Sequence, residues 1–110
     1  MTAPAAPIAT VYAVFASLDE AERIGRAVVE AGDAACVNIL APCRSIYRWQ
    51  GAVETATETP ALFKTRADHA AALAAKIAEM HSYDVPAIAV WPVEHSPESY
   101  AFWVAAETQR

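Results

Sequence analysis

The sequence predicts an α+β fold in which two helices cover one face of a four-stranded antiparallel sheet. Apolar strand-like runs and amphipathic helix-like stretches alternate in the order β-α-β-β-α-β, and one further helix follows. This order is typical of a ferredoxin-like sandwich, whose right-handed crossovers place both main helices on the same face. The length of 110 residues suffices for one domain with a buried core and is too short for two.

The chain divides into a short tail and one domain. Residues 1–7 are small and apolar and contain Pro4 and Pro7, so we expect them to form a flexible tail. A single ferredoxin-like domain is expected over residues 8–110. It begins with the run from residue 8 to residue 15, which is almost wholly apolar and rich in β-forming residues. This run predicts a central strand.

A capping-box pattern predicts the first helix. Ser17 is placed to accept a hydrogen bond from the amide of Glu20, and the Glu20 side chain can reach back toward the start of the helix. An apolar stripe at helical spacing follows, formed by Ala21, Ile24, Ala27, Val28 and Ala31. Gly32 is expected to end the helix in a left-handed conformation.

Residues 34–65 are predicted to form one long β-hairpin that turns near Gly51. Six residues on alternate positions before the turn are expected to share one face: Val37, Ile39, Ala41, Cys43, Tyr47 and Trp49. After the turn, Val53 and Phe63 share one parity, and Glu54, Glu58 and Lys64 share the other. A hairpin of this length extends past the sheet of one small domain, so we expect neighbouring subunits to cover it.

A second helix and a further strand follow the hairpin. The pattern at residues 65–68 predicts a helix start, and an apolar stripe continues as far as Met80. The helix is expected to end before Pro86, because the residue that precedes a proline disfavours helical geometry. Residues 87–93 then predict a buried strand, and Pro92 places that strand near an edge or an end of the sheet.

A final helix is predicted after Ser96. Ser96 is a favourable N-cap, Pro97 suits the first helical turn, and Glu98 carries a negative charge near the positive end of the helix dipole. The helix is rich in aromatic residues, which indicates that it docks on another surface. In one alternative the helix, Trp49 and Trp91 all contact a neighbouring subunit. In the other the helix covers the open face of its own sheet. Both alternatives stay open from the sequence.

Composition limits the classes of partner and compartment. The formal net charge of −5, without a cluster of lysine or arginine, excludes a nucleic-acid partner. Two cysteines seven positions apart do not form a disulfide framework and are expected to be reduced. No apolar run approaches the about 20 residues of a membrane span, and the first residues lack a secretory pattern. We therefore expect no membrane association and a cytoplasmic location.

Four segments together resemble the CutA family of divalent-cation tolerance proteins. They are residues 35–39 (Ala-Cys-Val-Asn-Ile), residues 45–51 (Ser-Ile-Tyr-Arg-Trp-Gln-Gly), Glu58 with residues 62–65 (Leu-Phe-Lys-Thr), and residues 81–86 (His-Ser-Tyr-Asp-Val-Pro). The resemblance extends over nearly the whole chain from Ile8. It implies a tight homotrimer, similar in architecture to PII-type signalling proteins, in which long hairpins extend the sheets of neighbours. It also implies copper tolerance and metal binding.

The resemblance indicates Cys36 and His81 as metal ligands. Cuprous copper prefers sulfur ligands and accepts imidazole as a further partner. Phe15 stands where some bacterial relatives carry another sulfur ligand, so that position supplies none here. A small buried hydrophobic residue is the alternative interpretation of Cys36. Cys43 and Met80 are the other soft side chains close to these segments, and Cys43 is interpreted as an interior or surface thiol. His69 and His95 have no cysteine or histidine at ligand spacing and are assigned no ligand role.

The resemblance further implies that Trp49, Glu58, Lys64 and Tyr83 line a cleft between subunits. The alternative, which we favour over chemistry, is that they form an ion pair and stacking contacts between subunits. The sequence also departs from the family pattern at two positions. Ser82 replaces the usual proline, and Ala87 replaces the glutamate that usually follows the proline at position 86.

No pattern for catalysis is recognisable in the sequence. A nucleophile with its base, a pair of carboxylates in contrasting environments and a metal shell with an open position are all missing, as is a glycine-rich phosphate loop. We therefore expect a non-enzymatic homotrimer that acts in copper tolerance and needs no cofactor, with copper or another divalent cation as its candidate ligand. A small-molecule or nucleotide sensor of PII type is the alternative, and an enzyme acting in the clefts is the third hypothesis.

Overall fold

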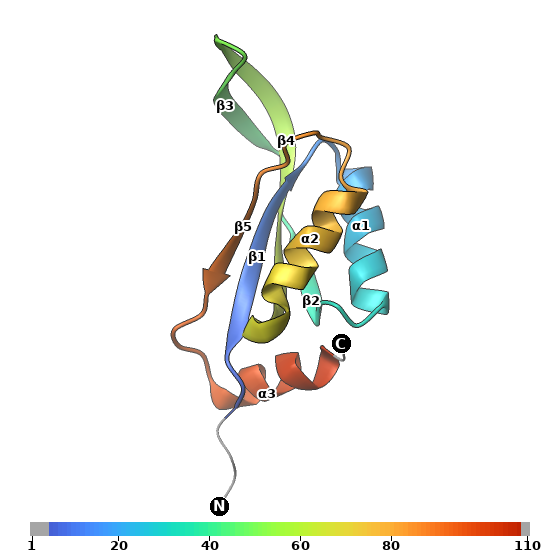
Figure 1. The fold of residues 1–110 in the computed structure, drawn as a ribbon, viewed down its shortest axis with the longest axis vertical. Helices are drawn as coiled ribbons and strands as arrows, with labels where there is room; N and C mark the ends of the chain where they lie inside the picture. The colour runs from blue at the N-terminus through green and yellow to red at the C-terminus, as the bar shows by residue number, and fades with distance from the viewer. Residues whose placement is uncertain (1–4, 109–110) are drawn as a thin grey trace, which may run out of the picture.

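The computed structural model describes residues 5–108 and confirms the predicted α+β element order. The elements are β1 (Ile8–Phe15), α1 (Leu18–Glu30), β2 (Cys36–Ile39), β3 (Cys43–Trp49), β4 (Ala52–Arg66), a 3₁₀ turn (Ala67–His69), α2 (Ala70–Met80), β5 (Ile88–Pro92) and α3 (Glu98–Glu107). The main sheet has the order β2-β4-β1-β5 with antiparallel neighbours, and β3 pairs with β4 beyond it. Figure 1 shows α1 and α2 on one face and the β3–β4 hairpin projecting from one end.

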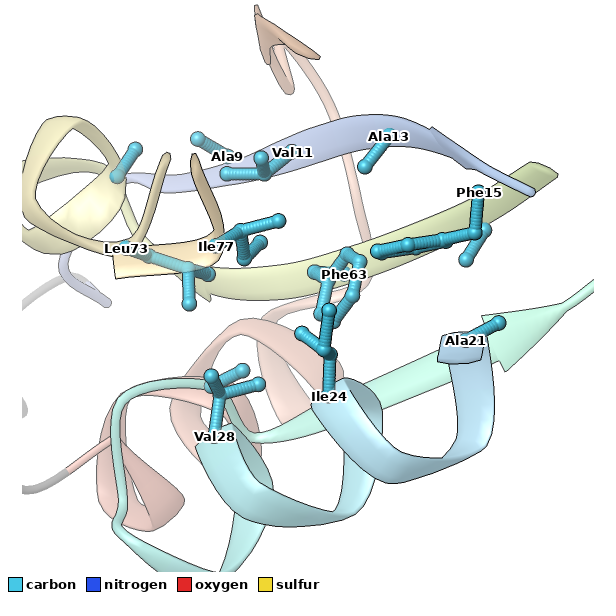
Figure 2. Close-up of a cluster of buried hydrophobic side chains, with 13 residues drawn as sticks. Ala9, Val11, Ala13, Phe15, Ala21, Ile24, Val28, Phe63, Leu73 and Ile77 are labelled. Carbon is cyan, nitrogen blue, oxygen red and sulfur yellow. The ribbon is translucent and has the colours of Figure 1, made fainter. Parts of the chain in front are cut away.

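The core lies between the sheet and the two main helices (Figure 2). Alternate residues of β1 and β4 point toward the helices, among them the fully buried Phe15 and Phe63. Their rings meet edge to face with centroids 6.2 Å apart. Four fully buried helix residues complete this layer: Ile24 and Val28 from α1, and Leu73 and Ile77 from α2.

The predicted start and end of α1 are confirmed. Ser17 Oγ accepts a hydrogen bond from the amide of Glu20 at 3.1 Å. The Glu20 carboxylate accepts from the amide of Ala16, at 3.2 Å. Gly32 follows the helix with a φ of 78°, as a left-handed end requires.

The long hairpin turns at Gln50 and Gly51, as the sequence predicts. Both residues have positive φ, 49° and 84°, which is the conformation of a tight two-residue turn between twisted strands. With 15 residues, β4 spans about 50 Å, so one half pairs with the main sheet and the other half pairs only with β3. Most residues of the outer half are therefore exposed within one chain.

The strand that precedes the turn is interrupted at residues 40–42. Ile39 pairs with Ala61 and Cys43 pairs with Glu58, so three residues on one strand face two on the other. This one-residue excess is a β-bulge. Pro42 favours the interruption, because it has no amide proton to donate to the ladder.

The bulge overturns the predicted common face from Val37 to Trp49. Val37 pairs with Phe63 and therefore faces the helices. Beyond the bulge, Tyr47 pairs with Glu54 and faces the opposite side of β4. Because one extra residue reverses the alternation of side chains, the aromatic residues of β3 share a face with the carboxylates of β4. The prediction of one apolar face and one charged face is wrong for this ribbon.

The start of the second helix differs from the prediction. β4 continues to Arg66, a 3₁₀ turn follows, and α2 begins at Ala70. Thr65 does not cap a helix, because its hydroxyl is buried and donates to the carbonyl of Asp33 at 2.9 Å. A contact with a residue 32 positions away thus replaces the local capping pattern.

The start of the last helix also differs. Pro97, not Ser96, occupies the N-cap of α3, and its carbonyl accepts from the amide of Ala101 at 3.2 Å. The Ser96 hydroxyl donates to the same carbonyl at 3.3 Å. The predicted side-chain cap by Ser96 is therefore wrong, although the helix itself forms where the sequence places it.

α3 lies at the end of the sheet opposite the projecting hairpin (Figure 1). It packs Ala101 and Val104 against Ile8 and Ala35 in a second buried cluster. Its two large aromatic residues that point away from this cluster, Phe102 and Trp103, remain 45% and 44% exposed. The helix thus covers part of its own sheet and also leaves an apolar surface open.

The tail is described only in part. Residues 1–4 of the tail predicted at residues 1–7 lie outside the described residues, and the carbonyl of Pro7 accepts a hydrogen bond from the amide of Ala67 at 2.8 Å. Within residues 5–108, no helix combines the length and apolar character that a membrane span requires.

Candidate functional site

A cleft of about 640 Å³ lies between the β3–β4 hairpin and the segment that leads into β5. Three of the four predicted cleft residues line it: Trp49 from β3, Glu58 from β4 and Tyr83 from the segment after α2. Tyr12 and Val14 on β1 also contribute to its lining. The structure thus brings residues from three distant parts of the chain to one concave surface.

A hydrogen bond between Tyr83 and Glu58 links the two sides of the cleft. The Tyr83 hydroxyl donates to Oε2 of Glu58 at 2.7 Å. Burial of the ring and this hydrogen bond to a carboxylate raise the pKa of Tyr83 far above its ordinary value of 10.0. Tyr83 is therefore a neutral donor throughout the physiological pH range.

His81 fixes the segment that carries Tyr83. Its Nε2 lies 2.7 Å from the carbonyl of Val14, which can only accept, so this nitrogen carries the proton. Its Nδ1 accepts from the amide of Tyr83 at 3.1 Å. The ring is buried and stacks on Phe15 with centroids 5.0 Å apart. Both nitrogens are therefore engaged within the chain.

Glu20 joins the start of α1 to the same segment. One carboxylate oxygen accepts from the amide of Ala16, and the other accepts from the amide of Ser82 at 2.8 Å. Burial acts to raise the pKa of Glu20, but the hydrogen bonds from Ser82 and Ala16 outweigh it, and the pKa lies below the ordinary 4.5. The ionised carboxylate thus holds two backbone amides in place.

The variant Glu20→Gln is expected to lower the free energy of unfolding by about 2 kcal/mol at pH 7, because an amide side chain can satisfy only one of the two backbone donors. The lowered pKa means that Glu20 stabilises the fold fully above pH 4.5, and that this contribution is lost as pH falls through the folded-state pKa. Urea unfolding at pH 7 and at acidic pH measures both effects. The exposed Glu22→Gln is the control, and an equal loss for both variants would contradict the assignment.

Cys36 lies on the face of the sheet that α1 and α2 leave open, at the end farther from the cleft. It pairs with Lys64 across the β2–β4 ladder, and its Sγ is 4.0 Å from the hydroxyl of Tyr100 on α3. The thiol is half-buried and free, as is that of Cys43, whose Sγ is 3.8 Å from Ser45 Oγ. Cys36 is therefore more accessible than a core residue.

The structure does not bring Cys36 and His81 together within one chain. Cys36 pairs with Lys64 of β4, and Lys64 pairs with Thr10 of β1, whereas His81 hydrogen-bonds to Val14 of β1. Thr10 and Val14 are four residues apart along β1, a distance of about 13 Å. Among residues 5–108, no three His, Cys, Asp or Glu side chains gather closely enough to hold a metal ion.

Lys64 lies apart from the other predicted cleft residues. It is six positions from Glu58 on β4, a distance of about 20 Å along the strand. Its ammonium group donates to Oδ1 of Asn38 on the neighbouring strand β2. Within one chain, Lys64 therefore belongs to the surface around Cys36 and not to the cleft.

Sequence reasoning missed several residues of the site. Tyr12, Tyr47, Glu54 and Asp84 line the cleft but were given no site role. The alternation in the hairpin contained a signal for Tyr47, but the bulge that turns it toward Glu54 could not be recognised. Glu20 appeared only as part of a helix cap, and its bond to Ser82 joins residues 62 positions apart.

Comparison with known proteins decides the family. The chain matches the family described as CutA1 divalent ion tolerance protein over residues 9–107. The chain belongs to the CutA1 family. A divalent-cation tolerance protein CutA of Archaeoglobus fulgidus is 38% identical over 94 residues, which cover 86% of this chain and 91% of the relative. The CutA protein of Pyrococcus horikoshii is 36% identical over 100 residues, or 91% and 97% of the two chains.

Solved structures of CutA1 proteins share the fold. CutA1 from Oryza sativa superposes with a TM-score of 0.91 at 30% identity and covers 96% of either chain. A CutA structure from Archaeoglobus fulgidus gives a TM-score of 0.89 at 35% identity, with 93% of this chain and 99% of that chain covered. The ferredoxin-like fold and the CutA resemblance predicted from four segments are both confirmed.

The predicted cytoplasmic location is wrong by this comparison. The Archaeoglobus fulgidus structure is that of a protein described as a periplasmic divalent cation tolerance protein. The prediction rested only on the lack of a recognisable secretory pattern at the first residues. A missing pattern of this kind is a weak argument for any compartment, and the CutA1 family includes a protein assigned elsewhere.

Proposed function

We propose that this CutA1-family chain acts in tolerance to divalent cations, copper in particular, as a homotrimer without catalytic activity. The observation that carries the proposal is the family match over residues 9–107, nearly the whole chain. The hydrogen bonds in and beside the cleft support a role without catalysis. Tyr83 donates to Glu58 inside the cleft, and His81, which lies beside it, is held by the carbonyl of Val14 and the amide of Tyr83, so these groups are committed to structure.

The projecting hairpin supports the homotrimer. Its outer half exposes large apolar side chains, with Ile46 at 72% and Val53 at 63%. Exposed apolar residues on a long ribbon favour association, since strand edges and apolar faces left in water promote pairing with another chain. A closed ring of copies would cover these residues on every subunit.

For the metal we propose Cys36 as the copper ligand, because its thiol is free and half-buried and sulfur is the donor that cuprous copper prefers. His81 is engaged at both nitrogens and lies at another level of the sheet. Further ligands would therefore come from a neighbouring subunit in the homotrimer. Neither a metal nor a cofactor is required for the fold in this proposal.

Copper titration of purified protein against a cuprous chelator tests the ligand. The variant Cys36→Ala is expected to lose one copper equivalent per chain and to weaken uptake at least about tenfold, as loss of a principal ligand does. Cys43→Ala is the matched control, because its thiol is equally free and half-buried. Equal copper uptake by wild type and Cys36→Ala would remove Cys36 from the proposal.

A small-molecule sensor is the second candidate, and the cleft of about 640 Å³ favours it, because the volume lies within the range of ligand pockets. A nucleotide fits this cleft poorly. Glu54, Glu58 and Asp84 line it, and their carboxylates repel phosphate groups. A thermal-shift panel tests this candidate, since a ligand that binds the folded state raises the unfolding temperature.

A further inference from the structure

The cleft combines aromatic rings with carboxylates. Tyr47 stands directly opposite Glu54 in the β3–β4 ladder, and Trp49 follows Tyr47 on the same face of β3. Cross-strand neighbours of this kind have Cβ atoms about 5 Å apart, so ring and carboxylate lie side by side. From the facing segment Tyr83 adds a third ring.

We propose that this cleft binds a small organic cation, an alkylammonium group placed over the faces of Tyr47, Trp49 and Tyr83 and balanced by the carboxylates of Glu54 and Glu58. The proposal deepens the sensor candidate by naming its ligand class. It is independent of the copper role assigned to Cys36, which lies at the other end of the open sheet face.

Ring exposure leaves room for such a group. Within a single chain Tyr47, Trp49 and Tyr83 are 39%, 41% and 36% exposed, so none of the three rings is fully covered by its own subunit. A cation over an aromatic face is attracted by the negative charge of the π-system, most strongly for tryptophan. An alkyl body adds apolar contact with Val14 and Val85, which also line the cleft.

The charges of the cleft select a cation. Three carboxylates belong to its lining, those of Glu54, Glu58 and Asp84, and no lysine or arginine is among the described lining residues. The two arginines of β3, Arg44 and Arg48, alternate with Tyr47 and point to the other face of the ribbon. The formal net charge of −5 adds a long-range attraction for cations.

A metal ion fits the cleft less well than an organic cation. Hard divalent cations need several oxygen ligands that converge at about 2–2.6 Å from one point. The carboxylates here do not form such a group among residues 5–108. Glu58 already accepts a hydrogen bond from the Tyr83 hydroxyl. This bond fixes the orientation of the carboxylate and leaves its negative charge in place.

Titration of the full-length protein with butyltrimethylammonium, followed by ligand-observed NMR, tests the proposal. We expect saturable binding that Trp49→Ala and Glu58→Gln each weaken about tenfold, through loss of one ring face or one charge. Glu58→Gln keeps the shape and an acceptor for Tyr83, so it separates charge from structure. Trp103→Ala is the matched control, because Trp103 on α3 is 44% exposed against 41% for Trp49.

Three results would overturn the proposal. They are the lack of saturable binding to wild type, unchanged affinity in Trp49→Ala and Glu58→Gln, and equal binding of butanesulfonate, an anion of the same chain length. Displacement of the probe by stoichiometric Mg²⁺ would reassign the cleft to a divalent cation. All of these results leave the copper titration of Cys36→Ala unaffected, so failure of this inference and failure of the tolerance role are distinguishable.

Discussion

The variant Phe63→Ala is expected to lower the free energy of unfolding by about 3–5 kcal/mol, the range for truncation of a buried aromatic residue. Phe63 is fully buried at the centre of the sheet, where β4 pairs with β1 on one side and with β2 on the other. Its ring contacts Phe15, so truncation also removes an edge-to-face pair. A cavity between sheet and helices would remain, because elements on all sides hold it open.

Urea unfolding at one fixed protein concentration measures this effect, since association of chains contributes to apparent stability. Phe63→Leu fills most of the space and is expected to retain about half of the lost stability. Thr57→Ala is the control on the same strand and the same face, at an exposed position. If Phe63→Ala and Thr57→Ala unfold at the same urea concentration, the core assigned here is wrong.

The variant Ile46→Glu is expected to convert the proposed homotrimer into monomers. Ile46 is 72% exposed in one chain, so a carboxylate there costs the monomer little. In an assembly that covers the ribbon, the same carboxylate would be buried without a partner, at a cost of about 3–5 kcal/mol for each subunit. Three such costs in one ring exceed the association energy of most small interfaces.

Sedimentation at micromolar concentration measures the result. Wild type is expected at three times the 11.8 kDa mass of one chain, and Ile46→Glu at the mass of one chain. The control Leu18→Glu introduces the same charge at a 50% exposed position, the first residue of α1 and outside the β3–β4 hairpin, and should stay assembled. A monomeric wild type, or an Ile46→Glu variant that keeps the full mass, would contradict the role of the hairpin.

Patterns that act over a few residues predicted most of the fold. β1 has the predicted bounds, because an apolar run in a central strand has few alternatives. Ser17 and Gly32 bound α1 as expected, since capping depends on local geometry. Two helix starts were wrong because longer-range contacts compete. Thr65 satisfies its hydroxyl at Asp33, and Pro97 takes the place expected for Ser96.

The candidate site was harder to predict, because its residues meet only in three dimensions. The resemblance placed Trp49, Glu58 and Tyr83 in one cleft, and the structure brings these three together. It did not indicate that Lys64 lies about 20 Å farther along β4. The sequence also gives no sign that His81 uses both nitrogens within the chain, because one partner is a backbone carbonyl 67 positions away.

The bulge between Ile39 and Cys43 has a consequence for how this chain can vary. The number of residues in the interruption, and not their identity, decides which side of the ribbon carries Tyr47 and Trp49. Deletion of a single residue there would turn both rings away from Glu54 and dismantle the cleft without disturbing the core. We therefore expect a change in the length of residues 40–42 to alter the cleft more than a substitution within them.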